Sequence, residues 1–229
     1  YPAPYLSTML FCSALNDVAD GPTKKAILPG IARGEIKGSL ALFDQPGDPH
    51  IDNISLEADD TSDGLFLRGS KPFVHDCGSV NYYLVAYRQA GSLYLVLLDA
   101  DHVGLKQSHS PTMDLTKRTG RLSLDNIEIS NAARFAVDEK QLQRLFDVGA
   151  VGIAAEMIGA AESVLAMTIT YAQDRTQFGH AIGKYQGVKH RLSEMYVDIE
   201  SFKSLVYYAA WTITESEQEL ARSASLAKA

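Results

Sequence analysis

One turn of the chain holds most of the residue types that bind ligands. Asp174–Gly179 reads Asp-Arg-Thr-Gln-Phe-Gly, and a further glycine follows at Gly183. Arginine offers a planar fork of donors suited to phosphate, a glutamine amide can pair with the edge of a heterocycle, and phenylalanine can pack against a ring. Arg175, Gln177 and Phe178 are therefore candidates for a ligand site. On these residues alone, a solvated turn held by salt bridges is the alternative.

No other stretch offers a self-contained site. The sequence has no GxGxxG, GxxxxGK[ST], GxSxG or HExxH pattern, and its six histidines include no pair at metal-ligand spacing. His190 is expected to be a polar surface residue or an inter-helix hydrogen-bond partner. Cys12 and Cys77 form no CxxC motif. We therefore expect neither a zinc site nor a disulfide framework. We also expect the protein to work in a reducing compartment.

Two long helices must position the turn. Apolar residues recur at helical spacing from Glu139 to Gln173 and from Tyr185 to Glu215, and a third helix starts near Ser216. The second helix carries a seam that we expect to be buried in a bundle: Val188, Leu192, Met195, Ile199, Phe202 and Val206. The first helix is rich in small residues, which permit tight helix packing or the approach of a flat ligand: Gly149, Gly152, Gly159 and Ala160.

The first part of the chain predicts helices and then strands. Helices are expected at Leu6–Val18 and Lys24–Ile31, the second capped by Thr23 and kept short or irregular by Pro29. Short extended runs follow, with a hairpin turn at Gln89–Gly91: Gly38–Phe43, Asn53–Ala58, Leu65–Arg68, Val80–Tyr87, Ser92–Leu98, Val103–Lys106 and Arg121–Ile129. Many short strands joined by turns indicate a small barrel or a sandwich.

Length and charge limit the class of protein. A chain of 229 residues, 46% of them hydrophobic, can bury a sizeable core as one large domain or two small ones. The net charge of −7 argues against nucleic acid and anionic membranes as partners. We find no signal peptide and no apolar run of transmembrane length. The chain begins at Tyr1 and stops inside a helical pattern, so we expect the middle part of a longer polypeptide.

Several motifs resemble those of the acyl-CoA dehydrogenase family. Arg175–Gln186 resembles that family's signature R-x-Q-F-G-x-x-I-x-x-x-Q. Ala26–Glu35 resembles the entry to the family's β-domain, Gly69–Val74 its G-x-K-x-[WFY]-[IV] strand, and Asp114–Asn126 its closing segment. The resemblance implies an α+β fold. Its parts are the end of an N-terminal helical domain (1–35), a middle β-barrel (36–132) and the first part of a C-terminal helical bundle (133–229).

The resemblance also implies a cofactor and a reaction. The family binds FAD between the β-domain of one subunit and the bundle of a neighbour, and it dehydrogenates acyl-CoA thioesters at the α,β carbon–carbon bond. Residues that match its cofactor contacts are Arg175, Gln177, Phe178 and Gln186 on the bundle, and Phe73 and His75 on the β-domain. Phe146 and Asp147 match a substrate-facing pair. In the family a carboxylate removes the α-proton while the β-hydrogen leaves as hydride to the flavin.

Three departures from the family pattern leave the catalytic residues unknown. Its [TS]-E-P-x-x-G-S-D loop is degraded here to Asp44–Ile51. The arginine that usually follows the substrate-facing pair is Ala150, and one of the family's two positions for the catalytic glutamate is Gly149. The commoner position lies beyond Ala229. Glu156 is about two turns along the helix from the first position, so we do not select it.

Two functions follow from the resemblance. The first is an active FAD-dependent acyl-CoA dehydrogenase. The second is a catalytically silent subunit that completes the FAD site of an active paralogue. In either case we expect a homo- or hetero-oligomer, dimeric or tetrameric, of acyl-CoA dehydrogenase-like chains. Heteromeric members of the family occur in bacteria that degrade sterol side chains, so a steroid-CoA substrate is expected. The expected location is the bacterial cytoplasm, or the mitochondrial matrix in a eukaryote.

Overall fold

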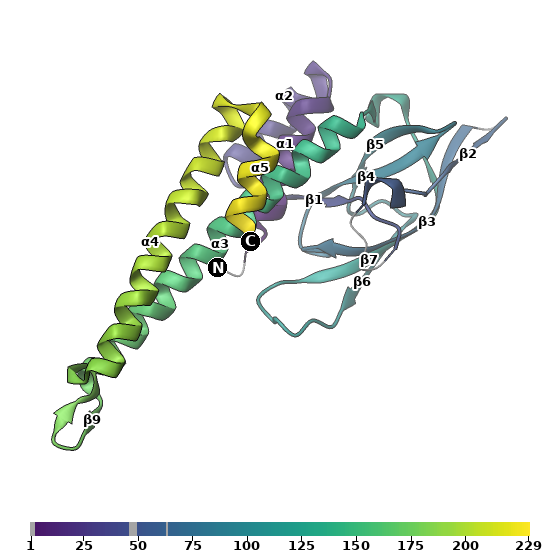
Figure 1. Cartoon of the computed structure of the whole chain (residues 1–229). Helices are drawn as coiled ribbons and strands as arrows, with labels where there is room; N and C mark the ends of the chain where they lie inside the picture. Colours follow the sequence, from purple (N-terminus) through teal and green to yellow (C-terminus); the bar gives the residue numbers. More distant parts are fainter. Residues whose placement is uncertain (1–2, 46–49, 63) are drawn as a thin grey trace. The chain divides into compact units, whose positions relative to one another are not determined.

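The computed structural model describes residues 3–45, 50–62 and 64–229, and Figure 1 shows their secondary structure. The chain divides into two compact units, Tyr1–Leu145 and Phe146–Ala229. The boundary falls within a single long helix, α3 (Glu139–Asp174). The three predicted segments, 1–35, 36–132 and 133–229, stay predictions.

The first unit begins with two helices, α1 (Tyr5–Val18) and α2 (Gly21–Ala32). The predicted cap of α2 was wrong, because the cap is Asp20, whose Oδ1 accepts a hydrogen bond from the Thr23 amide at 2.8 Å. The irregularity predicted from Pro29 was also wrong, since α2 continues to Ala32. Pro29 lies exposed in the last turn, where water can replace the one backbone hydrogen bond that proline removes.

The strands of the first unit form two four-stranded sheets. One has the order β1-β4-β5-β8 and the other β2-β3-β7-β6. The first contains β1 (Gly38–Ala41), β4 (Tyr82–Gln89), β5 (Ser92–Asp99) and β8 (Arg134–Ala136). The second contains β2 (Ala58–Thr61), β3 (Gly64–His75), β7 (Thr119–Glu128) and β6 (Leu105–Ser110). No hydrogen-bonded pairing of the described strands joins the sheets into a closed barrel, so the barrel expectation was wrong and the sandwich alternative holds.

The core of the first unit lies between these two sheets. Tyr83, Val85 and Val96 come from one sheet, and Leu67 and Leu122 from the other, and all are fully buried. Alternate residues of β4 and β5 face this layer, and the residues between them, such as Leu84 and Leu95, are buried on the other face of the sheet. The predicted strand at Asn53–Ala58 was wrong. A short 3₁₀ helix, η1 (Ile51–Asn53), occupies its start, and the strand β2 begins only at Ala58.

One charged side chain lies inside this apolar unit. Lys71 is fully buried, with its Nζ 2.7 Å from Asp44 Oδ1, and it donates a hydrogen bond to the Leu42 carbonyl at 2.9 Å. Asp44 Oδ2 also accepts from the amides of Ser55 and Leu56. Asp44, at the start of the degraded family loop, thus links Ser55 and Leu56 to Lys71 on β3. Residues 46–49 of the loop lie outside the described residues.

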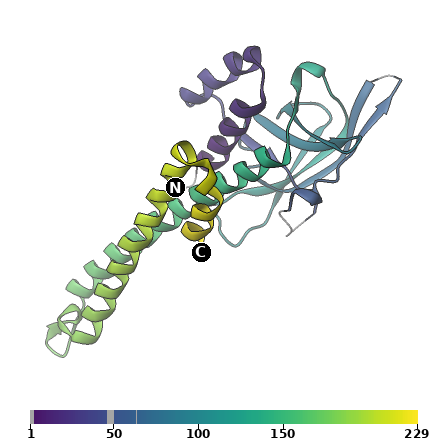
Figure 2. The same cartoon turned by 45° about the horizontal axis from the view of Figure 1, so that its top comes forward.

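The second unit is built on the antiparallel helices α3 and α4 (Gln186–Glu215), which run side by side in Figures 1 and 2. Lys203 on α4 joins them, because its Nζ lies 2.6 Å from Glu162 Oε1 on α3 and 2.8 Å from Glu200 Oε1. These hydrogen bonds raise the pKa of Lys203. α5 (Glu217–Lys228) folds back on α4, and Val151, Ala209, Leu220 and Ala224 form a small core.

The expected burial of the α4 seam was wrong for part of the helix. Val206 is buried, but Phe202 is 53% exposed and Met195 is similarly open to solvent. Two packed helices cover only one stripe of each other, so the remaining apolar residues of a bundle helix face outward until further elements cover them.

α3 is long and apolar enough to cross a membrane, judged by length and composition alone. The expectation of no apolar run of transmembrane length was therefore wrong, because the Ala, Val, Ile and Met residues of α3 fill a long window that holds few charges. A core helix of a soluble protein passes the same test. The ion pair of Glu162 with Lys203 shows that α3 packs against α4.

Candidate cofactor site

The turn selected from the sequence is a miniature β-hairpin between α3 and α4. Its strands are β9 (Thr176–Gln177) and β10 (His180–Ala181), which pair antiparallel. The two tip residues both have positive φ, 51° for Phe178 and 79° for Gly179, as a type I′ turn requires. Glycine tolerates this conformation, whereas a bulky residue such as phenylalanine is strained in it. Despite its apolar ring, Phe178 is 92% exposed.

Backbone contacts hold the hairpin against the end of α3. The Ile182 amide donates to the Arg175 carbonyl at 2.8 Å, and the Tyr185 hydroxyl donates to the Gln177 carbonyl at 2.9 Å. Gly183 packs so closely that a Cβ there would lie 2.9 Å from the Ala172 carbonyl oxygen. The turn glycines predicted from the sequence therefore have separate causes, a positive φ at Gly179 and close packing at Gly183.

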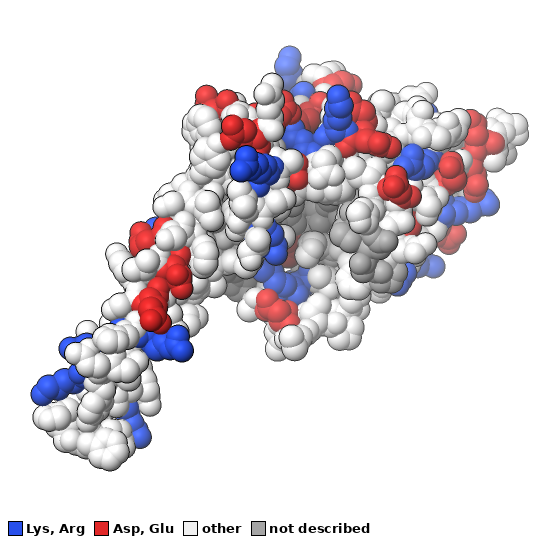
Figure 3. All heavy atoms as spheres, viewed as in Figure 1, with Lys and Arg blue, Asp and Glu red and all other residues white. Residues whose placement is uncertain are grey.

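The polar side chains of the hairpin are available to a ligand. The Arg175 guanidinium is exposed and forms no ion pair or hydrogen bond with any residue that the structure describes. The Gln177 amide bonds only to the neighbouring Thr176 carbonyl, and Gln186 is the exposed first residue of α4. Lys and Arg side chains gather at this end of the helix pair in Figure 3. The alternative of a turn held by salt bridges therefore lacks support at Arg175.

The two candidates from the first unit lie on β3. Its ladder with β7 is interrupted between Lys71 and Val74, and Phe73 within this break has a φ of 53°. Phe73 is 57% exposed, and His75 is also exposed. Buried Lys71 anchors the segment before the break, and the Ser39 hydroxyl donates to the His75 carbonyl at 2.6 Å after it. The segment therefore presents an aromatic ring and an imidazole from a fixed backbone.

These residues fit the demands of FAD. Guanidinium and amide groups suit its pyrophosphate and heterocyclic edges, and exposed aromatic rings suit its flat ring system. Phe73 and Phe178 share an exposed ring and a strained backbone, which is a combination that clusters at ligand sites. The two groups belong to different compact units.

The candidates on α3 leave the catalytic base unassigned. Phe146 and Asp147 lie in the helix with intermediate exposure, so both retain some accessible surface. Gly149 is buried and Ala150 is half-buried. Neither position supplies the carboxylate or the arginine that the family pattern places there.

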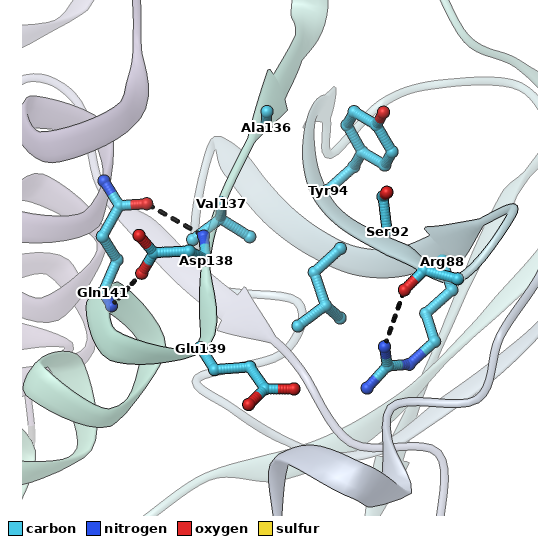
Figure 4. A pocket seen from close by; sticks show the side chains of 10 residues that line it. Arg88, Ser92, Tyr94, Ala136, Val137, Asp138, Glu139 and Gln141 are labelled. Carbon is cyan, nitrogen blue, oxygen red and sulfur yellow. Dashed lines mark hydrogen bonds between the residues drawn. The ribbon is translucent and has the colours of Figure 1, made fainter.

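A hollow at the start of α3 does not coincide with the candidate residues. It measures about 530 Å³ and is lined by the β4–β5 hairpin and residues 136–141 (Figure 4). Its polar groups satisfy one another: Arg88 donates to the Gly91 carbonyl, and Asp138 and Gln141 exchange side-chain-to-amide bonds of 2.8 and 2.9 Å. The latter pair is a capping box that starts α3. The hollow is therefore explained by a hairpin end and a helix cap.

No group of three or more His, Cys, Asp or Glu within residues 3–45, 50–62 and 64–229 is placed to hold a metal ion. Cys12 and Cys77 are free thiols, and burial raises the pKa of both.

Sequence reasoning missed two groups that shape the candidate site. Tyr185 lies inside the signature, but nothing in the sequence indicated that its hydroxyl bonds back to Gln177. The Asp44–Lys71 ion pair was also missed, because Lys71 stands between Ser70 and Pro72 and these neighbours give no local sign of burial.

Comparisons with known proteins agree on one family. The C-terminal domain of acyl-CoA dehydrogenases matches residues 140–229. Acyl-CoA dehydrogenase IpdE2 of Mycolicibacterium smegmatis is 38% identical over 112 residues, which is 49% of this chain and 33% of that protein. Butyryl-CoA dehydrogenase of Megasphaera elsdenii has the same fold, with a TM-score of 0.89 at 23% identity over 97% of this chain and 61% of that one.

A second solved structure, the ChsE4-ChsE5 complex of Mycobacterium tuberculosis, has a TM-score of 0.84 at 23% identity. The match covers 98% of this chain and 60% of the solved chain. The chain thus spans about three fifths of the solved structures and one third of IpdE2.

Proposed function

We propose that this chain is part of an FAD-dependent acyl-CoA dehydrogenase, because residues 140–229 match the C-terminal domain of that family and the chain shares the family's fold. The observation that carries the proposal is the α3–α4 hairpin. It exposes a strained phenylalanine ring beside an arginine that has no partner among the described residues. The strained backbone and the exposed ring of Phe178 cost free energy in the unliganded chain, and this cost is offset when a flat, phosphate-bearing ligand covers the hairpin.

In this proposal the candidate residues of the hairpin and of β3 contact different parts of FAD. Arg175 binds the pyrophosphate, Gln177 and Gln186 bind polar edges, and Phe178 and Phe73 cover ring faces. His75 offers a hydrogen-bond donor towards the reactive edge. FAD supplies the two-electron acceptor that α,β-dehydrogenation requires. Phe146 and Asp147 face the acyl-CoA.

The second candidate is a silent subunit that completes the FAD site of a related chain. Gly149 and Ala150 favour it, because neither offers the group that the family pattern places there. The role of Asp44 as a structural anchor also favours it, since this carboxylate is held by Lys71 and two amides. The solved ChsE4-ChsE5 complex, which has the same fold, supports a heteromeric assembly.

For the substrate we propose a CoA thioester with a steroid side chain. The support is a solved variant of the Tcur3481-Tcur3483 steroid ACAD. Its sequence is 26% identical and its TM-score is 0.78, and the match covers 97% of this chain and 59% of that one.

Flavin content measured together with native mass tests the proposed function. The full-length protein is expressed alone and with a neighbouring acyl-CoA dehydrogenase-like chain. An active dehydrogenase is expected to hold one FAD per chain and to bleach with an acyl-CoA. A silent subunit is expected to hold little flavin alone and one FAD per pair of unlike chains when assembled. Absence of FAD in every assembly would contradict both candidates.

Arg175→Ala tests the residue assignment. We expect it to weaken FAD binding by about tenfold or more, because a charge-assisted contact to phosphate is lost. Equilibrium dialysis of the assembled protein measures this loss. Arg191→Ala is the matched control, since Arg191 is exposed on the same unit and pairs only with Glu194 at 3.3 Å. Equal FAD affinity in the two variants would refute the role of Arg175.

A further inference from the structure

Tyr185 connects the hairpin to the start of α4. Its backbone is extended (φ −77°, ψ 135°), and its carbonyl accepts the amides of Val188 and Lys189 in the first turn of the helix. Its amide donates to the Ile182 carbonyl, and its hydroxyl reaches back to the Gln177 carbonyl at 2.9 Å. One residue therefore fixes the helix start and touches the hairpin strand that precedes the tip.

The hairpin needs such an attachment. β9 and β10 contain two residues each, and so short a ladder has little stability of its own in water. Its tip also carries the strained backbone of Phe178. The exposed position of the hairpin provides no apolar core to compensate, because the residues from Arg175 to His180 are all exposed.

The hydrogen bond from the Tyr185 hydroxyl is accepted by Gln177, the residue directly before the tip residue Phe178. The Gln177 carbonyl belongs to the peptide unit that enters Phe178. Holding that carbonyl fixes the plane of this peptide, and with it the direction of the Phe178 ring and the origin of the Gln177 side chain. A phenylalanine at position 185 would keep the ring packing of the tyrosine and lose only this hydrogen bond.

We propose that Tyr185 is a positioning residue for the FAD-binding hairpin. Its hydroxyl holds the Gln177 carbonyl so that Gln177 and Phe178 are set in place before the ligand arrives. The inference rests on the proposed function, because the ligand is FAD. Preorganisation of this kind raises affinity by reducing the ordering that binding must supply.

The test compares Tyr185→Phe with the wild type in the full-length protein and its native assembly. The control is Tyr171→Phe, because Tyr171 is an exposed tyrosine of the same unit whose hydroxyl bonds to no described residue. Amide hydrogen exchange of residues 176–181 is followed in the FAD-free protein, and the Kd of FAD is followed by quenching of flavin fluorescence. Thermal unfolding of the FAD-free protein reports global stability.

We expect Tyr185→Phe to speed exchange in the hairpin about fivefold, to raise the Kd of FAD about fivefold and to leave the melting temperature unchanged. Tyr171→Phe is expected to match the wild type in all three measurements. An unchanged Kd would overturn the inference, whether or not exchange or the melting temperature changes. A wild type that binds no FAD in any assembly would instead overturn the proposed function, and the exchange measurement would still show whether the bond orders the hairpin.

Discussion

Phe73 and Phe178 adopt a backbone conformation that phenylalanine rarely visits. Their φ angles are 53° and 51°, and both rings face solvent. The left-handed region costs a residue with a Cβ roughly 1–2 kcal/mol, and leaving a phenylalanine ring in water forgoes about 2 kcal/mol of burial. Folding alone gives no reason to accept both costs at the same residue. Binding of a flat ligand does.

Replacing the strained ring should therefore stabilise the unliganded protein. We expect Phe178→Asn to raise the free energy of unfolding by about 1 kcal/mol, because asparagine enters the left-handed region at lower cost. The melting temperature of the FAD-free protein should rise by about 3 °C, while FAD affinity falls. Phe202→Asn on α4 is the control and should not stabilise, since asparagine is a weak helix former. A lower melting temperature for Phe178→Asn would contradict the strain argument.

At the scale of elements, the buried ion pair joins the segment after β1 to the part of β3 that precedes Phe73. Lys71 Nζ reaches the Leu42 carbonyl and Asp44, and Asp44 in turn holds the amides of Ser55 and Leu56. Burial lowers the pKa of Lys71 from 10.5 to about 8, while the attraction of Asp44 acts to raise it. The pair thus orders three segments and leaves a titratable group inside the first unit.

Removing the lysine should be costly. We expect Lys71→Met to lower the free energy of unfolding by about 3–5 kcal/mol, because the largely buried Asp44 loses its cationic partner. Urea denaturation at neutral pH measures the loss. The double variant with Asp44→Asn should recover part of it, since the uncompensated charge is gone. No recovery in the double variant would show that the packing of the lysine stem matters more than the charge pair.

The same lysine should give the wild type a characteristic pH dependence. Between about pH 8 and pH 10.5 the folded protein binds fewer protons at Lys71 than the unfolded chain does, so stability rises with pH. From about pH 7.5 to pH 9 the gain is about 1 kcal/mol. Tyr83, Tyr87 and Cys77 have raised pKa values and act in the opposite direction, but they do so equally in both proteins. The difference in urea midpoint between wild type and Lys71→Met should therefore widen with pH, and a constant difference would contradict the lowered pKa.

The sequence predicted elements better than their arrangement. Long apolar periods placed α3 and α4 within a residue or two, and Ala90 and Gly91 form the predicted hairpin turn with φ values of 49° and 79°. The short strand β8 was not predicted, because three residues carry no period. Two sheets instead of a barrel, and the break in β3 that presents Phe73, depend on pairings between distant strands. Such pairings leave no local signal.

The candidate site was predictable to the level of residue type. The unusual composition of the turn selected Arg175, Gln177 and Phe178 without any structure. The strained φ of Phe178 and the free guanidinium of Arg175 emerged only from the folded chain. The roles of all candidate residues stay predictions until FAD binding is measured.

At the scale of the whole molecule, the second unit exposes more apolar surface than a solitary helix pair tolerates. Large side chains on α3 and α4 face solvent, among them Val164, Met167, Met195, Phe202, Tyr207 and Trp211. Large apolar side chains exposed in such number along two helices are typical of surfaces that are covered in the working protein. This exposure supports the proposed oligomer of acyl-CoA dehydrogenase-like chains.

A charge placed on that surface should prevent assembly. We expect Phe202→Glu to lower the native mass of the full-length protein to that of a smaller species while helical content is retained, because Phe202 is already half exposed. Size-exclusion chromatography with light scattering and circular dichroism measure the two quantities. Ser204→Glu, at an exposed polar position of α4, is the control and should leave the native mass unchanged. Full assembly of Phe202→Glu would place the contact surface elsewhere.

The capping box at the start of α3 also determines where the gene can be divided. A recombinant fragment that begins at Phe146 would start in mid-helix, with its first four amides uncapped. A fragment that begins at Asp138 brings its own cap, because Asp138 and Gln141 satisfy each other's amides. Such a cap contributes about 1 kcal/mol to the helix. The exchangeable module for chimaeras and domain swaps between related chains therefore starts at Asp138, ahead of the point where the compact unit begins.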